Sequence, residues 1–483
     1  MKTFQDLVAV GTNETNRMEF ILSAINEHKA SEDYKTALDA EQYMKTKNPT
    51  IMKYKKLLYK MTGEAVVDNF SANHKCASSF FRRFVTQENQ YLLGNGASFA
   101  TEGTKERIGG EDFDDVLQEA GRDALVEKVS FGFVNLDHVE VFKLTEFAPL
   151  WDEEDGGLKA GIRFWQISDD KPLRCTLYEI DGYTEYIRRK HNIDGKENEP
   201  IMEVLKPKRS YKQVVRESEA DGIEIIDGEN YPTFPIVPLW GNKEHQSELV
   251  TIRSQIDAYD LIKSGFANDL DDASLIYWTI SNVGGMDDID LAQFVERMKT
   301  VKAAVVGTDG STNAKAEAHT IDVPYASRET YLTRLEADMY KDFMALDVTQ
   351  IAAGQVTATQ IDAAYEPLNE KCDDYEYCVR KFIKGILAIL GIEDTVTFTR
   401  SKVSNKSEEI NSILACAEYL PQEYVVEKLL TILGDIDLVD EVLSQLADEN
   451  MSRMSYGEEE TEEIEEDTED DTLTELEELL GGL

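Results

Sequence analysis

Residues 242–269 have the sequence NKEHQSELVTIRSQIDAYDLIKSGFAND, and residues 328–346 have the sequence RETYLTRLEADMYKDFMAL. In both segments apolar residues recur every three or four positions, which is the spacing of one face of an α-helix. These residues are Leu249, Ile252, Ile256, Tyr259, Ile262 and Phe266 in the first segment, and Leu332, Leu335, Met339, Phe343 and Leu346 in the second. The first segment therefore predicts a helix roughly 40 Å long. The residues expected on its opposite, polar face are Arg253, Gln255, Asp260 and Lys263.

The two predicted helices bracket an insert, residues 271–326. An apolar helix stripe must be buried against another element or another copy of the chain, so we expect the pair to form the struts of a ring. The stripe residues expected to make these contacts are Leu249, Ile252, Ile256, Leu332, Leu335, Met339 and Phe343. Within the insert, 275–280 and 301–306 are predicted strands, 316–323 is the expected partner of the second, and 287–290 caps a short helix. Such a small α/β module packs only with help from neighbouring subunits.

Composition limits the classes of protein that the chain can represent. It has 483 residues and a formal net charge of −44, and its length favours about two to four domains. An acidic surface repels phosphate backbones and disfavours tight, non-specific binding of nucleic acid. The five cysteines are scattered without a C-x-x-C, which indicates a reducing compartment. No apolar run approaches the roughly 20 residues that span a bilayer, so we expect a soluble intracellular product.

The stretch that follows the second predicted helix is unusual because it lacks charge. Residues 348–357 have the sequence VTQIAAGQVT, in a chain whose other loops carry Asp, Glu or Lys. Its small, uncharged residues join two long predicted helices. A buried corner between these helices is the alternative interpretation of this stretch.

The N-terminal half predicts helices followed by strands. Residues 1–60 look helical and include the basic cluster Lys53-Tyr54-Lys55-Lys56, which is typical of a solvated face. Between residues 131 and 190 the apolar period changes to two and Asp-Gly turns appear, which predicts an antiparallel meander. Residues 191–228 are charged and poorly patterned, so we expect a long excursion at the edge of that sheet. The run 234–242 is turn-like.

After the neutral stretch the chain is expected to be mainly helical. A long helix is predicted from Ala358 to Leu390, with a kink at Pro367, followed by a strand at 396–400 that could return to the meander. Three short amphipathic helices are predicted next, over 407–420, 421–433 and 437–447. From Gly457 the chain is rich in Glu and Asp, which predicts disorder.

The sequence contains no recognisable catalytic constellation. It lacks G-x-S-x-G, P-loop, H-E-x-x-H and paired C-x-x-C motifs, and its six histidines are isolated. Three aspartate triplets, at 112–115, 269–272 and 287–290, leave a metal-dependent phosphodiesterase as an alternative, since two-metal nucleases use clustered carboxylates. An acidic adaptor or scaffold protein, monomeric or dimeric, is the other alternative. We expect no enzyme activity, no metal and no cofactor.

The order of several local segments resembles the portal proteins of tailed bacteriophages, in the family typified by the portal of phage SPP1. The segments that carry this resemblance are Phe234–Pro238 with Asn242–Leu249, Ile256–Asp260 and Ser264, Tyr91–Gly94, Thr357–Asp362 with Pro367–Lys371, and Pro421–Val425 with Asp437–Glu441. They span about residues 60–450. The chain departs from the pattern at Ala358-Thr359, where relatives often have Ser-Gly.

The resemblance implies an α+β multidomain portal fold and a role for each segment. Residues 1–240 and 358–403 would form a mixed α/β wing, 241–270 and 327–347 the helical stem, 271–326 the clip, 348–357 the tunnel loop, 404–450 a helical crown and 451–483 a disordered acidic tail. The tunnel-loop residues that would face DNA are Thr349, Gln350, Gln355 and Thr357. The clip residues that would form a docking surface are Tyr277, Trp278, Asp287, Asp288 and Arg297.

Portals of this family are usually rings of twelve subunits (homododecamers) at one capsid vertex, and double-stranded DNA passes through them during packaging and ejection. The resemblance therefore implies as partners other copies of the chain, DNA, terminase, major capsid and scaffolding proteins and a head-completion adaptor, with no membrane. It also implies a virion protein that assembles in the host cytoplasm. An acidic conduit agrees with this role, because it lets DNA slide without sticking.

Overall fold

The computed structural model describes residues 1–59, 63–68, 72–189, 192–193, 196–197, 201–218, 222–273, 277–281, 315–319, 325–349, 358–401, 410, 413–433, 438–439 and 442–446. These residues fall into two compact units. The first lies within 1–352 and 364–401, and the second within 353–363 and 402–483. The sheets and the two hydrophobic cores described below belong to the first unit.

Four helices open the chain: α1 (Phe4–Val10), α2 (Glu14–Ala30), α3 (Glu32–Met44) and α4 (Pro49–Lys53). Each begins after a polar residue whose side chain accepts a hydrogen bond from a backbone N–H of the first turn; these residues are Thr3, Asn13, Ser31 and Asn48. Such caps satisfy N–H groups that have no partner inside a helix. The helical prediction for residues 1–60 is confirmed as far as Lys53.

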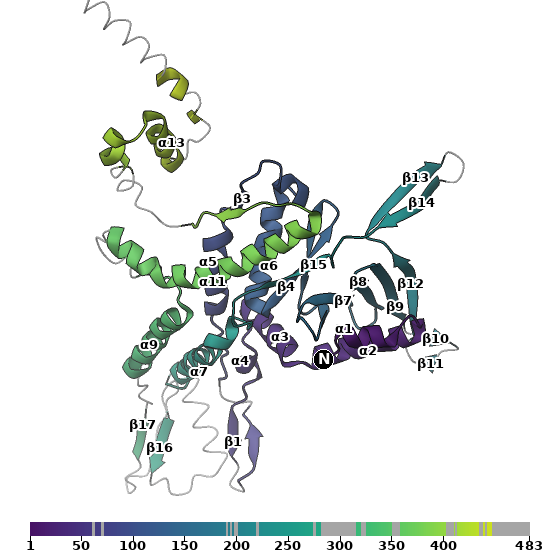
Figure 1. Ribbon diagram of the computed structural model, residues 1–483. Helices are drawn as coiled ribbons and strands as arrows, with labels where there is room; N and C mark the ends of the chain where they lie inside the picture. The colour runs from purple at the N-terminus through teal and green to yellow at the C-terminus, as the bar shows by residue number, and fades with distance from the viewer. Residues whose placement is uncertain are drawn as a thin grey trace, which may run out of the picture. The chain divides into compact units, whose positions relative to one another are not determined.

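The larger core lies between helices and a three-stranded sheet (Figure 1). Elements that contribute to it include α5 (Phe80–Leu93), the 3-10 turn η1 (Lys105–Ile108), α6 (Asp112–Glu127), β4 (Val129–Asn135), β5 (His138–Lys143) and β15 (Ile236–Trp240). Residues of α3 and of three long helices described below also belong to this core. The prediction of a turn over 234–242 is wrong for β15, because its five residues pair with β4. Pro238 is compatible with this pairing because β15 is an edge strand, in the order β15-β4-β5.

The smaller core lies between α1, α2 and a five-stranded antiparallel sheet. Its strands, in spatial order, are β12 (Ile201–Arg209), β9 (Gly182–Arg189), β8 (Leu173–Glu179), β7 (Leu158–Trp165) and β6 (Phe147–Trp151). The predicted meander is confirmed for β7, β8 and β9, but β5 belongs to the other sheet. The segment 191–228 is more regular than predicted, because it adds β12 to the edge of this sheet. It also forms two hairpins, β10 (Asn192–Ile193) with β11 (Lys196–Glu197) and β13 (Lys212–Ser218) with β14 (Gly222–Glu229).

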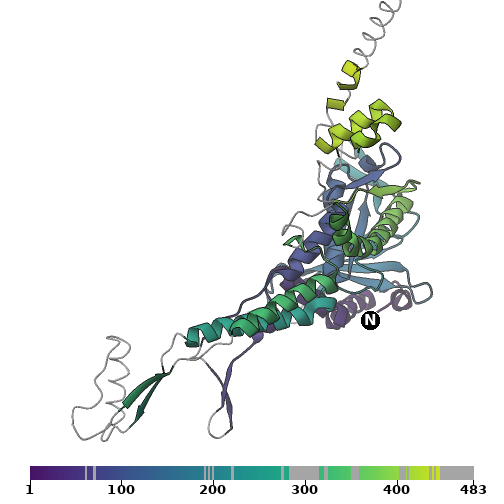
Figure 2. The ribbon, with the colours of Figure 1, turned by 90° about the vertical axis from the view of Figure 1, so that its left-hand side faces the viewer.

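Two long helices, α7 (Leu249–Ala273) and α9 (Tyr325–Phe343), lie side by side and project from the cores (Figures 1 and 2). We call them the stem pair. The first was predicted to begin at Asn242, but the Ser247 hydroxyl accepts the Leu249 N–H and α7 begins there. The second ends three residues earlier than predicted, because Met344 has a φ of 60°. The predicted helix bounds 242–269 and 328–346 are therefore corrected, whereas the assignment of 241–270 and 327–347 to a stem stays a prediction.

Two strands of the insert between these helices belong to the described residues. β16 (Tyr277–Ser281) and β17 (Lys315–His319) pair antiparallel. The segment at 316–323 was expected to pair with 301–306, whereas β17 pairs with β16. The strand expected at 301–306 and the helix cap at 287–290 lie outside the described residues.

The C-terminal part begins with the long helix α11 (Ala358–Leu390), which has the predicted bounds and contains Pro367; the kink there stays a prediction. β18 (Val396–Phe398) pairs with β3 (Ala97–Phe99), so the predicted return of this strand to the meander is wrong. In the second unit, η2 (Ala417–Tyr419) and α13 (Gln422–Leu433) lie in the predicted crown. The predicted acidic tail, 451–483, lies outside the described residues.

Candidate functional site

Two polar contacts set the register of the stem pair. The Gln255 amide on α7 donates to Asp342 on α9, and Asp269 on α7 pairs with Arg328 on α9. These contacts are fourteen residues apart on each helix, so the helices run antiparallel without a slip between them. The Arg328 guanidinium also lies 6.0 Å from the centroid of the Phe266 ring. The stem pair is therefore one strut, tied near both of its ends.

The apolar stripes of the stem pair face the core of the same subunit. The stripe residues that are at most 1% exposed are Leu249, Ile252, Ile256, Met339 and Phe343. The Phe343 ring stacks on Phe84 of α5, with centroids 4.9 Å apart, and such aromatic pairs add to the free energy gained from burial. These five residues, expected at contacts between subunits, are thus assigned to the subunit's own core. Leu332 and Leu335 are half-buried, and an intersubunit contact stays a prediction for them.

A buried ammonium group connects the stem to the rest of the first unit. Lys371 on α11 donates to Glu248 Oε2 at 2.7 Å and to the Phe343 carbonyl at 3.2 Å, and its Nζ lies 3.1 Å from Glu88 Oε2 on α5. Burial raises the pKa of Glu88 to about 7, although Lys371 acts in the opposite direction. We call this cluster of Glu88, Glu248 and Lys371 the junction. It holds α5, the start of α7, the end of α9 and α11 together.

The predicted tunnel loop starts five residues after Phe343, whose carbonyl accepts a hydrogen bond from Lys371 of the junction. The Gln87 side chain holds the backbone of Leu346 with two hydrogen bonds of 3.0 Å, donating to its carbonyl and accepting from its N–H. Thr349 is exposed, and its N–H and hydroxyl both donate to the Asp347 carboxylate. The other predicted tunnel residues, Gln350, Gln355 and Thr357, lie outside the described residues. The structure therefore describes how the base of the loop is fixed.

The predicted clip surface is described in part. Tyr277 and Trp278 lie on β16, where they pair in register with His319 and Ala318 of β17. Asp287, Asp288 and Arg297 lie outside the described residues. A docking role for these five residues stays a prediction.

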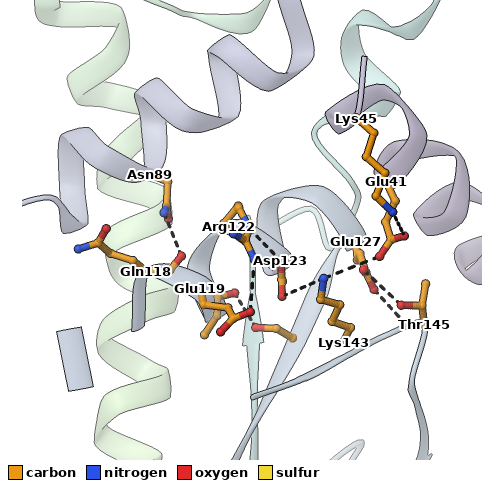
Figure 3. A network of polar contacts seen from close by, with 12 residues as sticks. Glu41, Lys45, Asn89, Gln118, Glu119, Arg122, Asp123, Glu127, Lys143 and Thr145 are labelled. Atoms are coloured by element: carbon orange, nitrogen blue, oxygen red, sulfur yellow. Dashed lines mark hydrogen bonds and ion pairs between the residues drawn. The ribbon is translucent and has the colours of Figure 1, made fainter. Parts of the chain in front are cut away.

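A second polar network lines a cavity of about 740 Å³ between α3, α5 and α6 (Figure 3). Lys143 Nζ lies 3.7 Å from Asp123 Oδ2 and 3.8 Å from Glu41 Oε1, and Arg122 donates to the other oxygen of Asp123 at 3.0 Å. Glu127 accepts from both the N–H and the hydroxyl of Thr145. Each charge thus has an oppositely charged or donating neighbour, as buried charges require.

Glu127 is the most perturbed carboxyl group of this network. Burial raises its pKa to about 8, and the neighbouring Glu41 and Asp123 add to this shift while the Thr145 N–H opposes it. The pKa of Lys143 is raised because these three carboxylates outweigh the effect of its burial. Lys143 and the carboxyl groups of Glu41, Asp123 and Glu127 join α3, α6 and β5, so the geometry of the network suits a proton-dependent brace between these elements.

The described aspartate triplets make structural contacts. Asp114 accepts from the Ala97 N–H and pairs with Lys105 at 2.6 Å, and Asp269 and Asp271 pair with Arg328 and His74. Within the described ranges, no group of three or more His, Cys, Asp or Glu residues could hold a metal ion. Among the described helices, none combines the length and the apolarity needed to cross a membrane.

Neither polar network was predicted from the sequence. Glu88 and Lys371 are distant in the sequence, and their pairing depends on how α5 and α11 pack. One local signal was present: Glu88 lies on the same helix face as Val85 and Leu92, one turn from each, and all three are buried. A charged residue within an apolar stripe indicates a buried partner elsewhere.

Comparison of the sequence with known proteins identifies its family. The family model for phage portal proteins of the SPP1 Gp6-like type matches residues 24–472. The portal protein of Bacillus phage SPP1 is 24% identical over 395 residues, which cover 75% of this chain and 74% of that protein. The portal protein of Clostridium phage phiCD119 is 26% identical over 204 residues, which cover 41% of this chain and 45% of that protein.

A solved structure, the neck of a native GTA particle computed with C12 symmetry, is similar at 11% identity and a TM-score of 0.37, covering 72% of this chain and 89% of that chain. The family match spans most of the sequence, as the resemblance predicted. The chain belongs to the SPP1 Gp6-like family of phage portal proteins.

Proposed function

We propose that this chain is the subunit of a ring at one vertex of a phage capsid, through which DNA enters during packaging and leaves during ejection. The observation that carries the proposal is the family match over residues 24–472. The stem pair supports it, because two antiparallel helices tied near both ends form a strut of the kind that a ring wall needs. We infer twelve copies per ring and assembly in the host cytoplasm from the family resemblance.

The same proposal assigns partners to the two ends of the chain's first unit. The insert that carries Tyr277 and Trp278 would meet terminase during packaging and a head-completion adaptor afterwards. The wing would face the major capsid and scaffolding proteins. The chain itself would perform no motor chemistry, and the separate terminase would supply the energy of translocation.

The neutral stretch 348–357 is proposed as the tunnel loop. Gln87 and Lys371 fix its base at Leu346 and Phe343, so the loop would extend from a rigid point. Neutral amides and hydroxyls at Thr349, Gln350, Gln355 and Thr357 would offer weak contacts to phosphates without the counterion release that makes DNA binding tight. Gln350→Arg with Gln355→Arg should therefore keep the ring but slow packaging. Normal packaging yield in assembled particles with both substitutions would exclude this role.

Electron microscopy of the purified protein tests the main proposal. Rings with a mass that is a multiple of the 54.6 kDa chain are expected, and mass photometry gives the copy number. Monomers or dimers under all assembly conditions would favour an acidic adaptor instead. Cleavage of DNA with added magnesium would favour the phosphodiesterase, which no observation on the described residues supports.

A further inference from the structure

A segment far from the stem in sequence lies along one face of α7. Residues 48–78, which we call the arm, follow α3 and precede α5. The arm contains α4 and a hairpin of β1 (Leu57–Tyr59) and β2 (Ala65–Val67), which pair antiparallel. The α7 side chains that accept hydrogen bonds from the arm are Asp257, Asp260, Ser264, Asn268 and Asp271. These residues are three or four apart, so they form one row along the helix.

Both ends of the arm are fixed to the same part of α7. At its start, the Asn48 amide donates to Asp257 at 2.9 Å and to Asp260 at 2.8 Å. At its end, the Ser78 N–H donates to the second oxygen of Asp260 at 2.9 Å. Asp260 is fully buried, although the sequence pattern placed it on the outer face. The arm therefore leaves α7 and returns to it as a loop with a closed base.

A cavity of about 150 Å³ lies between the arm and α7. Its lining includes Lys56, His74 and Lys75 from the arm, and Ser264 and Asn268 from α7. A water molecule takes up about 30 Å³ of liquid volume, so this space is large enough for a small polyatomic ion. The cavity is therefore polar on both of its sides, the arm and the helix.

The two polar side chains that α7 contributes to the cavity are oriented as hydrogen-bond donors. The side-chain oxygen of Asn268 accepts the His74 N–H at 2.7 Å, so the NH₂ of the same amide remains as a donor. The Ser264 hydroxyl oxygen accepts the Cys76 N–H at 3.0 Å, which leaves the hydroxyl hydrogen to donate. The backbone of the arm thereby sets the polarity of the opposite wall.

The arm side of the cavity is positively charged, in a chain with a net charge of −44. Lys56 and Lys75 both line the cavity, and the Lys75 ammonium donates to the Met52 carbonyl. A carbonyl oxygen does not neutralise the ammonium charge, and an ammonium group has three hydrogens to donate. The carboxylates nearby are engaged in ion pairs of their own, Asp269–Arg328 and Asp271–His74. The cavity therefore offers positive charge to an anion.

We propose that this cavity binds a phosphate group, held between Lys56 and Lys75 of the arm and Ser264 and Asn268 of α7. A phosphate has acceptor oxygens on all sides, so it needs donors from more than one direction, and lysine is a common phosphate ligand. Donors on two walls match such a tetrahedral ion better than they match a planar carboxylate. A free phosphate ion and a phosphate of the DNA backbone share this chemistry. The site does not depend on formation of the proposed ring.

A glycine in the cavity wall allows the space to be filled without removing a donor. Gly265 lies one helical turn from Leu261, Asn268 and Asp269, and all four residues line the cavity. A Cβ added at Gly265 meets no atom within 4 Å. Leucine also favours a helix more than glycine does, so Gly265→Leu should fold. Its side chain would occupy the cavity while every charged and polar group of the site stays in place.

Titration of the full-length protein with inorganic phosphate, followed by calorimetry, tests the site. We expect saturable binding of one phosphate per chain, and slower amide exchange at 51–56 and 72–76, because a ligand stabilises the state that binds it. The double variant Lys56→Met with Lys75→Met should bind roughly tenfold more weakly or worse, since it loses charged hydrogen-bond donors. Gly265→Leu should lose binding. The matched control, Lys53→Met with Lys55→Met, removes the same charge from exposed arm positions outside the cavity lining and should bind as the wild type does.

A short DNA duplex added as a competitor identifies the source of the phosphate. Displacement of inorganic phosphate by the duplex assigns the site to the DNA backbone, and retention of bound phosphate assigns it to a free ion. A wild-type protein that binds neither probe saturably overturns the inference. Equal weakening by the Lys56/Lys75 and Lys53/Lys55 pairs, or unchanged binding in Gly265→Leu, also overturns it, because the binding would then follow overall charge. Normal rings without phosphate binding would leave the proposed function intact.

Discussion

Replacing Lys371 by Met should loosen the junction between the stem and α5. The substitution leaves two carboxylates in a site where Glu88 is 1% and Glu248 7% exposed, and it removes the hydrogen bond to the Phe343 carbonyl. Removing one partner of a buried ion pair typically costs about 3–5 kcal/mol, because the remaining charge is uncompensated. Such a cost corresponds to roughly two to four orders of magnitude in the equilibrium for local opening.

The size of this effect should depend on pH. The pKa of Glu88 is about 7, above its ordinary value of 4.5. A group whose pKa is raised in the folded state contributes stability that is present below its unfolded pKa and is lost as the pH rises through its folded pKa. Without Lys371 the pKa of Glu88 rises further, so the carboxyl is neutral at pH 5.5 and forced to ionise only at high pH. The cost should therefore be small at pH 5.5 and largest near pH 8.

Hydrogen exchange followed by mass spectrometry measures this local opening at both pH values, after correction for the intrinsic rates. Peptides from α5 and from the end of α9 should lose protection in Lys371→Met. The control is Lys243→Met, which removes an exposed pair with Asp374 of the same helix α11 and should change little. Adding Glu88→Gln to Lys371→Met should restore part of the protection. Equal protection in the Lys371 and Lys243 variants, or the same loss at both pH values, would refute the reasoning.

Three further predictions concern the other network, the loop base and the tail. Because the pKa of Glu127 is raised to about 8, its stabilising contribution is lost as the pH rises through 8, so Glu127→Gln should flatten the fall of the melting temperature between pH 6 and 9. Gln87→Ala removes two hydrogen bonds to Leu346, worth about 1 kcal/mol each, and should speed amide exchange at 345–349 by roughly tenfold or more; an unchanged rate would show that the clamp is unimportant. Truncation after Ser455 should leave ring formation on mass photometry unchanged, since the acidic tail lacks the apolar area to offset its ordering entropy; loss of the ring would make the tail structural.

Local periodicity accounts for what could be predicted from the sequence. The stripes of α7 and α9, the bounds of α11 and the strands β7 to β9 follow from spacings of 3.6 and 2 residues, which depend only on near neighbours. The family was predicted separately, from the resemblance carried by the order of local segments such as Phe234–Pro238 and Pro421–Val425, and the match over residues 24–472 confirms it. Helix ends were less predictable, because the Ser247 cap and the left-handed Met344 depend on individual backbone contacts.

Tertiary structure alone decided which of these surfaces are buried, and by what. Asp260 was predicted on the outer, polar face of its helix, yet its side chain is fully buried. Its carboxylate accepts hydrogen bonds from Asn48 and Ser78, which lie about two hundred residues earlier in the sequence. β18 likewise pairs with β3, which lies about three hundred residues earlier in the chain, and Lys371 contacts one carboxylate on α5 and another just before α7. A side chain's own chemistry sets its cost of desolvation. The partner that offsets this cost is brought by the fold, so the contacts of Asp260, the junction and the Glu127 network could not be predicted from local patterns.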